Sequence, residues 1–241
     1  MHPILFHLGR HPVPTFAVLA VLGLVAALAL SERTAKLAGL LPEQLLDAAQ
    51  FAAVAAFVVT RVLLIAANWK AFLSAPLFLV VFPSLTPLGM LLTTVATILW
   101  LRFKHTPALK VLDAWAPCAT LLWCFLALGH FAEGSDPGLP TLLPWATRLP
   151  RSSFATHPVA LYAALIAAAF TFLLWVLLRR KHAPGRVAGA GFLLVGVTQF
   201  LLTFLRQPGL QFGGLDWLQW TALVMLTCGG VLLARSASVA D

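Results

Sequence analysis

Long apolar runs recur along this chain of 241 residues and constrain its fold more than any other feature. Hydrophobic residues make up 61% of the sequence and charged residues 10%, against about half and about a quarter in an ordinary soluble domain. So few charged side chains cannot cover the surface of a water-soluble protein. The composition therefore excludes a soluble enzyme, a nucleic-acid-binding protein and a disordered chain, and it predicts a polytopic membrane protein.

Each long apolar run is expected to form a helix, because a backbone in lipid must satisfy its own hydrogen bonds. The pattern predicts an all-α protein of seven transmembrane helices that forms a single integral membrane domain over residues 1–241. The expected spans are 14–31, 46–68, 85–101, 111–131, 158–178, 187–205 and 215–234. A shorter apolar run, 71–82, is followed by Pro83 and Pro87, so we expect an interfacial or re-entrant segment there.

The basic residues predict the orientation of these spans. An outside N-terminus would place ten of the 16 lysines and arginines in cytoplasmic segments, mainly in two clusters at 102–110 and 179–186. The positive-inside rule then favours an outside N-terminus and a cytoplasmic C-terminus. Contact of the two clusters with anionic headgroups accounts for the net charge of +8 without a nucleic-acid partner.

The first apolar run admits a second interpretation. Arg10, the apolar stretch 16–30 and the triplet Ala27-Leu28-Ala29 are typical of a secretory signal peptide with its cleavage site. Cleavage would turn the segment that contains Arg33 and Lys36 into an exported N-terminus. Charge does not decide between the two interpretations, since nearby glutamates almost balance those two cations.

The connection between the fourth and fifth expected spans, at about 132–157, is the longest one and is rich in glycine and proline. It is expected to be a periplasmic loop, and a loop of this length is more often functional than idle. At its start His130, Glu133 and Asp136 recur at a spacing of three, which on one helical face could hold a metal or supply an acid and a base. Gly134 and Pro137 interrupt such a helix, so we expect no metal site. The three cysteines, Cys118, Cys124 and Cys228, lie in apolar runs and are expected to be buried free thiols.

Arg61 is the most informative single residue. It lies eight residues before Trp69, hence about 12 Å below the interface that this tryptophan would mark. An ionisable group at that depth usually faces the interior of a bundle or a polar cavity, where a guanidinium could bind a phosphate or a carboxylate. The alternative is that the long side chain extends to the outer headgroups.

Other polar residues are expected in the same outer half of the bilayer as Arg61. They are His130, Glu133, His157, Tyr162, Gln199 and Arg206. Such a set suits an enzyme that handles a phospholipid headgroup, because cations would bind the phosphodiester while an acid–base pair served the transferred group. Several members also have purely structural interpretations: Pro158, which follows His157, suits the first turn of a helix, Tyr162 suits an interfacial aromatic, and Arg206 suits a membrane boundary.

The order of several short motifs resembles that of the bacterial prolipoprotein diacylglyceryl transferases. The motifs are His2 to Gly9 (HPILFHLG), Arg61, Asn68-Trp69, Asp113 to Pro117 (DAWAP), Gly129 with Phe131, Gly134 and Gly138, His157 to Tyr162 (HPVALY), Pro184-Gly185, Gly196 with Phe200, Arg206-Gln207-Pro208, and Gln219. The resemblance covers nearly the whole chain and implies the same architecture of seven helices, with the first helix retained.

The resemblance implies transfer of a diacylglyceryl group from phosphatidylglycerol to the cysteine of a prelipoprotein, without a cofactor or a metal. Phosphatidylglycerol or another anionic phospholipid and a prelipoprotein signal segment would then be the partners. The candidate bases are His130 and His157. The candidate ligands of the phospholipid headgroup are Arg61, Lys70, Gly138, Tyr162 and Arg206.

The chain departs from the family pattern at most of the family's charged catalytic positions, so we expect a divergent member. The replacements are Phe16, Pro87, Ala127, His130, Ser135, Ala160, Ala163, Val195, Gln199 and Thr203. A neutral side chain cannot replace a guanidinium that neutralises a phosphodiester. A second hypothesis is therefore a catalytically inactive relative that binds phospholipid or lipoprotein, or that serves as a subunit of a membrane assembly with a protein partner. A transporter or channel is a third, disfavoured because we find no internal repeat.

Overall fold

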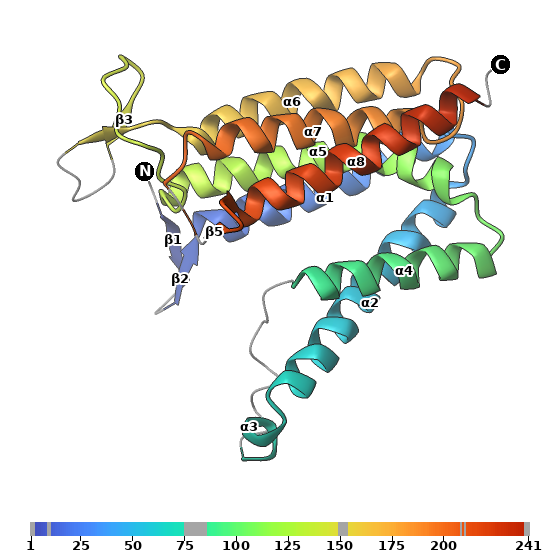
Figure 1. The fold of residues 1–241 in the computed structure, drawn as a ribbon, viewed down its shortest axis with the longest axis horizontal. Coiled ribbons are helices and arrows are strands. Elements are labelled where there is room, and N and C mark those ends of the chain that lie inside the picture. Colours follow the sequence, from blue (N-terminus) through green and yellow to red (C-terminus); the bar gives the residue numbers. More distant parts are fainter. Residues whose placement is uncertain are drawn as a thin grey trace.

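A computed structural model describes residues 3–8, 11–74, 86–148, 154–207, 209 and 211–238. Figure 1 shows long helices side by side in one bundle, and their contacts run from α1 to α5, from α5 to α6 and α7, and from α7 to α8. These helices are α1 (Thr15–Leu37), α5 (Ala108–Glu133), α6 (Val159–Leu178), α7 (Arg186–Thr203) and α8 (Trp217–Ser238).

A helical hairpin diverges from this bundle. It consists of α2 (Pro42–Ala67), the short α3 (Trp69–Ser74) and α4 (Pro87–Phe103). α2 begins next to the end of α1 and then runs away from the bundle, with α4 packed along it and α3 at its far end (Figure 1). The cap of α4 is local, since the Thr86 hydroxyl accepts a hydrogen bond from Gly89 N at 3.1 Å and Pro87 occupies the first turn, where it loses no hydrogen bond.

The helices agree with the expected spans. All seven expected runs coincide with a helix, and six helices within the described residues are long and apolar enough to cross a membrane. The seventh, α4, is apolar but has 17 residues. The chain is thus a mostly helical, multi-pass membrane protein. The expected interfacial run 71–82 begins in α3, and its remainder from residue 75 lies outside the described residues. Residues 2, 9 and 208 of the motifs and Arg10 also lie outside them.

Short strands that the all-α prediction did not include join the helices at one end of the bundle. β1 (Ile4–Leu8) pairs with β2 (His11–Pro14), β3 (Thr147–Arg148) with β4 (Ala155–Thr156), and β5 (Gln211–Phe212) with β6 (Leu215–Asp216), each pair antiparallel. Figure 1 shows the labelled strands of all three hairpins at the end where α6 and α8 begin and α5 ends. Pairing of this kind satisfies backbone groups that lie outside the helices.

Small residues let the helices approach closely, as in other membrane bundles. A Cβ at Gly229 of α8 would lie 2.9 Å from the Gly189 carbonyl oxygen of α7, so only glycine fits there. Among the described residues, 11 of the 21 buried hydrophobic side chains are alanines, such as Ala35 and Ala48 at one end of the molecule and Ala163 and Ala164 at the other. Close backbone packing therefore supplies much of the contact between the helices.

The cysteines follow the prediction in part. Cys118 is buried, with Sγ 3.5 Å from the Thr34 hydroxyl, and Cys124 is half-buried. Cys228 is exposed on α8, so the prediction of a buried thiol is wrong there. An apolar run identifies a helix suited to lipid but does not tell which of its faces the protein covers.

Candidate functional site

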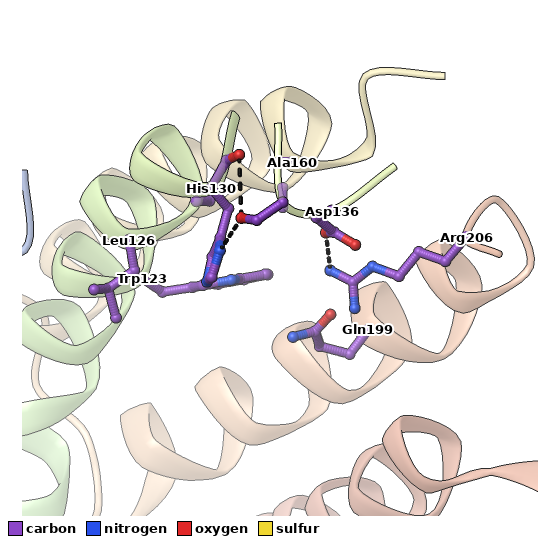
Figure 2. A pocket seen from close by; sticks show the side chains of 10 residues that line it. Trp123, Leu126, His130, Asp136, Ala160, Gln199 and Arg206 are labelled. Carbon is purple, nitrogen blue, oxygen red and sulfur yellow. Dashed lines mark hydrogen bonds and ion pairs between the residues drawn. The ribbon is translucent and has the colours of Figure 1, made fainter. Parts of the chain in front are cut away.

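A polar cavity of about 400 Å³ opens between α5 and α7 at the end of the bundle that carries the strands. Figure 2 shows Trp123 and His130 projecting from α5 into this space, opposite Gln199 and Arg206. Gln199 lies on α7, and Arg206 follows its last turn. The lining is completed by small, apolar and loop residues: Leu126, Ala127, Ser135, Asp136, Ala160 and Ala163.

The end of α5 holds the histidine of the cavity. α5 ends at Glu133, and Gly134 then adopts a left-handed conformation (φ 71°) that turns the chain back on the helix. This turn brings the Ser135 hydroxyl to 2.9 Å from His130 Nδ1, while the Phe16 ring packs at 4.8 Å from the imidazole. In the tautomer whose Nδ1–H donates to Ser135, Nε2 carries the lone pair and can accept a proton.

The same turn separates the residues whose spacing suggested a metal site. Asp136 leaves the helical face and lines the cavity, whereas Glu133 is not among the lining residues. Within the described ranges, no group of three histidine, cysteine or acidic side chains is close enough to hold a metal ion.

Asp136 instead forms an ion pair with Arg206, at 3.0 Å between a carboxylate oxygen and a guanidinium nitrogen. Both side chains are largely covered, with exposed fractions of 24% for Asp136 and 15% for Arg206. Partial burial strengthens such a pair relative to one in water. The pair therefore fixes the guanidinium at the wall of the cavity.

Two polar atoms at this wall have no hydrogen-bond partner in the described part of the chain. They are Nε of Arg206 and Oε1 of Gln199, and both are buried. Figure 2 shows the Gln199 amide next to the Arg206 guanidinium. A buried polar group without a partner is costly, so a ligand that hydrogen-bonds to this wall would bind favourably.

The loop between α5 and α6 forms one side of the cavity and is fixed to α7. Leu139 N donates to the Leu205 carbonyl at 2.8 Å, and Gly138 pairs with Arg206 in an isolated β-bridge. Gly138 also packs directly on His157: an added Cβ would lie 2.8 Å from the His157 Cβ and would overlap its carbonyl oxygen. The absence of a side chain at Gly138 is thus what allows the loop to reach α7.

His157 and Tyr162, at the start of α6, contact this loop and support it. His157 N donates to the Leu139 carbonyl at 3.0 Å, and the Tyr162 hydroxyl accepts a hydrogen bond of 2.7 Å from the Trp145 indole. The two rings lie 6.3 Å apart. Neither side chain lines the polar cavity. Of the two histidines expected as bases, the structure therefore brings only His130 to the cavity together with Arg206.

The two remaining candidates lie on the hairpin. Arg61 is in the second half of α2, 7% exposed, with its guanidinium 4.9 Å from the centre of the Phe57 ring. Lys70 is exposed on α3. Neither residue lines the polar cavity, which lies between α5 and α7. The structure thus does not join the seven expected residues into one site.

A second cavity continues the polar one along the bundle. Its volume is about 450 Å³, and Trp123 and Gln199 line both cavities. The other lining residues are mainly apolar and come from α5, α7 and α8: Leu112, Trp115, Ala116, Ala119, Thr120, Ala188, Gly191, Phe192, Val195 and Met225. A polar chamber that shares a wall with an apolar one suits an amphipathic ligand with a charged head and a hydrocarbon tail.

Some lining residues were not singled out from the sequence. Trp123 and Leu126 precede His130 on α5 by seven and four residues, so they share its helical face. That spacing was the available signal. The apolar cavity had no such signal, because its residues do not differ in kind from those that face lipid.

Comparison with known proteins identifies the family. The family model described as prolipoprotein diacylglyceryl transferase matches residues 3–235. A phosphatidylglycerol–prolipoprotein diacylglyceryl transferase of Polynucleobacter asymbioticus is 34% identical over 157 residues, which cover 62% of this chain and 60% of the relative. Relatives of the same name are 32% identical in Idiomarina loihiensis (61% of this chain, 58% of the relative) and 32% identical in Nitratidesulfovibrio vulgaris (64% and 60%). The matched segments thus span about 60% of the length of these relatives. The match of the family model over nearly all of the sequence shows that the chain belongs to the prolipoprotein diacylglyceryl transferase family.

Proposed function

We propose that this protein transfers a diacylglyceryl group from phosphatidylglycerol, or a closely similar anionic phospholipid, to the cysteine thiol of a prelipoprotein signal segment. The observation that carries the proposal is the polar cavity with Arg206 at its wall, continued by an apolar cavity between α5, α7 and α8. The headgroup would occupy the first cavity and an acyl chain the second. The substrates are those that the names of the relatives state.

The reaction needs three tasks from the protein. The thiol sulfur attacks the glyceryl carbon that bears the phosphate, so that a carbon–sulfur bond forms and the bond between that carbon and the phosphate oxygen breaks. Glycerol phosphate leaves with the bonding electrons, and the thiol proton goes to a base. The protein must therefore hold the phosphate, accept the proton and align the two substrates.

Arg206 is suited to hold the phosphate. Its planar guanidinium can donate to phosphate oxygens in a fixed geometry. Asp136 limits its motion, and the Gln199 amide beside it adds a neutral donor. We assign the substrate contact to Arg206 and Gln199, and the positioning of Arg206 to Asp136.

His130 is suited to accept the thiol proton. It lines the same cavity as Arg206, and its contact with Ser135 orients the ring. We assign His157, Gly138 and Tyr162 to the support of the loop that closes the cavity, through the contacts of His157 with Gly138 and of Tyr162 with Trp145. Arg61 and Lys70 are assigned to the hairpin, without contact to the phospholipid in this cavity.

The proposed setting is the inner membrane of a bacterium, with seven spans and an outside N-terminus. Counting α4 as a span puts the ends of α1, α4, α6 and α8 and the starts of α2, α5 and α7 on one side. Ten of the 16 lysines and arginines then belong to that side, which the positive-inside rule makes cytoplasmic. The polar cavity and its loop, at about 132–157, would face the periplasm within a single membrane domain.

A second candidate function is phospholipid or lipoprotein binding without transfer, by a protein that could serve as a subunit of a membrane assembly. It is favoured by the wall of the cavity, where Ala127, Ala160 and Ala163 contribute no charge. Among the residues described as lining the polar cavity, Arg206 is the one arginine or lysine. One guanidinium neutralises a phosphodiester less completely than several would.

The wild-type protein in phosphatidylglycerol nanodiscs separates the two candidates. It would be incubated with a lipobox peptide, and mass spectrometry would be used to detect the diacylglyceryl thioether and the phospholipid that remains bound. Formation of the thioether in proportion to protein concentration is the result expected of a transferase. Retention of phosphatidylglycerol without any thioether, with the peptide intact, would reject transfer and leave binding.

A further inference from the structure

A third cavity, which we call the basic cavity, lies at the opposite end of the bundle from the polar one. It has a volume of about 360 Å³, within the range of about 300–1,000 Å³ typical of small-molecule sites. Three parts of the chain enclose it: the turn after α1 around Gly39, the first turns of α5 with Lys110 and Asp113, and the segment Leu178–Pro184 between α6 and α7. None of these residues takes part in the proposed transfer reaction.

Cations dominate the lining. Lys110, Arg179, Arg180 and Lys181 face a single carboxylate, that of Asp113. Within the described residues none of these four cations has a carboxylate oxygen within 4.0 Å. Lys110 is half-buried, and its ammonium lies 3.8 Å from where a Cβ at Gly39 would be, so it is held inside the cavity rather than extended into solvent.

Asp113 accepts hydrogen bonds from the backbone and, within the described residues, forms no ion pair with any of these four cations. Its carboxylate accepts hydrogen bonds from Gly185 N at 2.7 Å and from Ala188 N at 2.8 Å, and thereby caps the first turn of α7 from a different helix. The carboxylate is 1% exposed, and His182 Nδ1 lies 3.9 Å from it. These contacts hold the α6–α7 connection, and with it the cationic run 179–181, against the start of α5.

Apolar surface adjoins the cavity. Leu37 lines it and is 40% exposed, and on α6 Phe172 and Leu173 are 66% and 49% exposed one to two turns before Arg179. A free phosphate ion would gain nothing from contact with this apolar surface, whereas the acyl chains of a phospholipid would cover it. Basic pockets between membrane helices next to apolar surface are typical sites for anionic headgroups.

We propose that the basic cavity binds the phosphate group of an anionic phospholipid from the leaflet at this end of the protein, with Lys110 and the run Arg179–Lys181 as its ligands. This lipid is distinct from the substrate phospholipid, which would bind at the other end of the bundle. The preorganised connection favours a specific, retained lipid over loose attraction to the membrane surface. The site depends on neither the transfer reaction nor its residues.

Native mass spectrometry of the purified full-length protein tests the proposal. The protein would be released from micelles that contain equal amounts of phosphatidylglycerol and phosphatidylcholine. The double variant Lys110→Gln/Lys181→Gln removes two cations of the cavity. The matched control, Lys36→Gln/Arg102→Gln, removes two exposed cations that lie at the same end of the bundle but do not line the cavity.

We expect the cavity variant to retain phosphatidylglycerol with an occupancy lower by about twofold or more, and the control variant to match the wild type. Equal retention in both double variants would overturn the proposal, because the basic charge would then act only as a diffuse field. Thermal midpoints from tryptophan fluorescence check folding. If the double variant does not fold, the single variant Lys181→Gln, at an exposed position, is measured under the same criteria.

Sodium phosphate in phosphatidylcholine micelles distinguishes a lipid from a soluble ligand. Absence of a phosphate adduct, together with the retained phosphatidylglycerol, supports the lipid. A phosphate adduct that is lost in the cavity variant and kept in the control supports the phosphate site itself and assigns its ligand to a soluble phosphate. Unchanged thioether formation by the cavity variant would show that the two sites are separate.

Discussion

The residues of the polar cavity divide into those that touch the proposed substrate and those that hold them. Arg206 and His130 belong to the first group, and each is fixed by a neighbour from the turn after α5, Asp136 and Ser135 respectively. The two functional side chains therefore depend on one short segment, 134–136. A change in that turn would disturb phosphate binding and proton transfer together.

Replacement of His130 by glutamine should lower the rate of transfer by about 100-fold or more, because a positioned general base typically contributes about 10²–10⁴-fold. Ser135→Ala should cost less, since Ser135 only orients the ring. The measurement is the initial rate of thioether formation, with His7→Gln as a control at an exposed histidine of the same end. A normal rate for His130→Gln combined with a loss in His157→Gln would move the base to His157.

Replacement of Gly138 by alanine should lower the thermal midpoint and the transfer rate together. The new methyl group would collide with His157, and overpacking of this kind typically costs about 1–3 kcal/mol. Gly230→Ala is the matched control, because nothing lies within 4 Å of a Cβ built at that glycine of α8. A Gly138→Ala protein with the midpoint and rate of the wild type would show that the loop does not need this close contact.

Among the elements, the hairpin of α2, α3 and α4 bears most directly on the assignment of the site. It carries Arg61 and Lys70, the two cations that sequence analysis assigned to the phospholipid, yet it diverges from the helices that form the cavity (Figure 1). Within the described structure, neither residue lines the cavity that we assign to the substrate.

Arg61→Gln should therefore reduce stability rather than catalysis. Loss of the buried guanidinium and its contact with the Phe57 ring should lower the free energy of unfolding by about 1–2 kcal/mol. The transfer rate per folded molecule should stay within about threefold of the wild type. Lys70→Gln, at an exposed position, should change neither quantity. A loss of about 100-fold in rate in either folded variant would place that residue at the substrate after all.

The helices could be predicted because an apolar run that is long enough to cross a bilayer has few alternatives to a helix. Their ends were less predictable. α1 continues to Leu37, six residues past the expected end, because Thr34 and Ala35 are buried by packing that hydropathy does not report. The wrong prediction for Cys228 has the same cause, because local sequence does not show which faces of a helix contact protein and which contact lipid.

Part of the site could be predicted from the sequence. His130 and Arg206 were expected in the same half of the membrane, and they do line one cavity. The divergence of the hairpin, the apolar cavity and the ion pair of Asp136 with Arg206 depend on contacts between residues far apart in sequence. The position of a residue along a membrane helix predicts its depth in the membrane but not which helix its side chain faces. Arg61 was expected at the depth of the site, but it lies on the hairpin and does not line the cavity.

At the scale of the whole molecule, the two ends of the bundle have different characters. One end carries the strands, the loop and the polar cavity, and the other carries the basic cavity and most of the cations. In the proposed orientation, with seven spans and an outside N-terminus, the first end would lie in the periplasm, where the proposed transfer to an exported prelipoprotein would take place. The proposed orientation and the proposed function therefore require each other.

Labelling of single cysteines in a cysteine-free background tests this orientation. Leu142 is a fully exposed residue of the α5–α6 loop, and Leu142→Cys should react with a membrane-impermeant maleimide in intact cells once the outer membrane is opened. Ser238→Cys at the end of α8 should react only after lysis. The opposite pattern would contradict the orientation. Labelling of both positions in intact cells would contradict the number of spans.

The central claim, that Arg206 in the polar cavity holds the phosphate during transfer, is tested most directly by the transfer rate of Arg206 variants from phosphatidylglycerol to a lipobox peptide. We predict a loss of about 100-fold or more for Arg206→Gln, because a neutral amide cannot compensate the phosphate charge in a site of low dielectric, and a smaller loss for Arg206→Lys. Arg148→Gln, an exposed arginine on β3 at the same end, should react at the rate of the wild type. A folded Arg206→Gln protein that transfers at the rate of the wild type would contradict the claim.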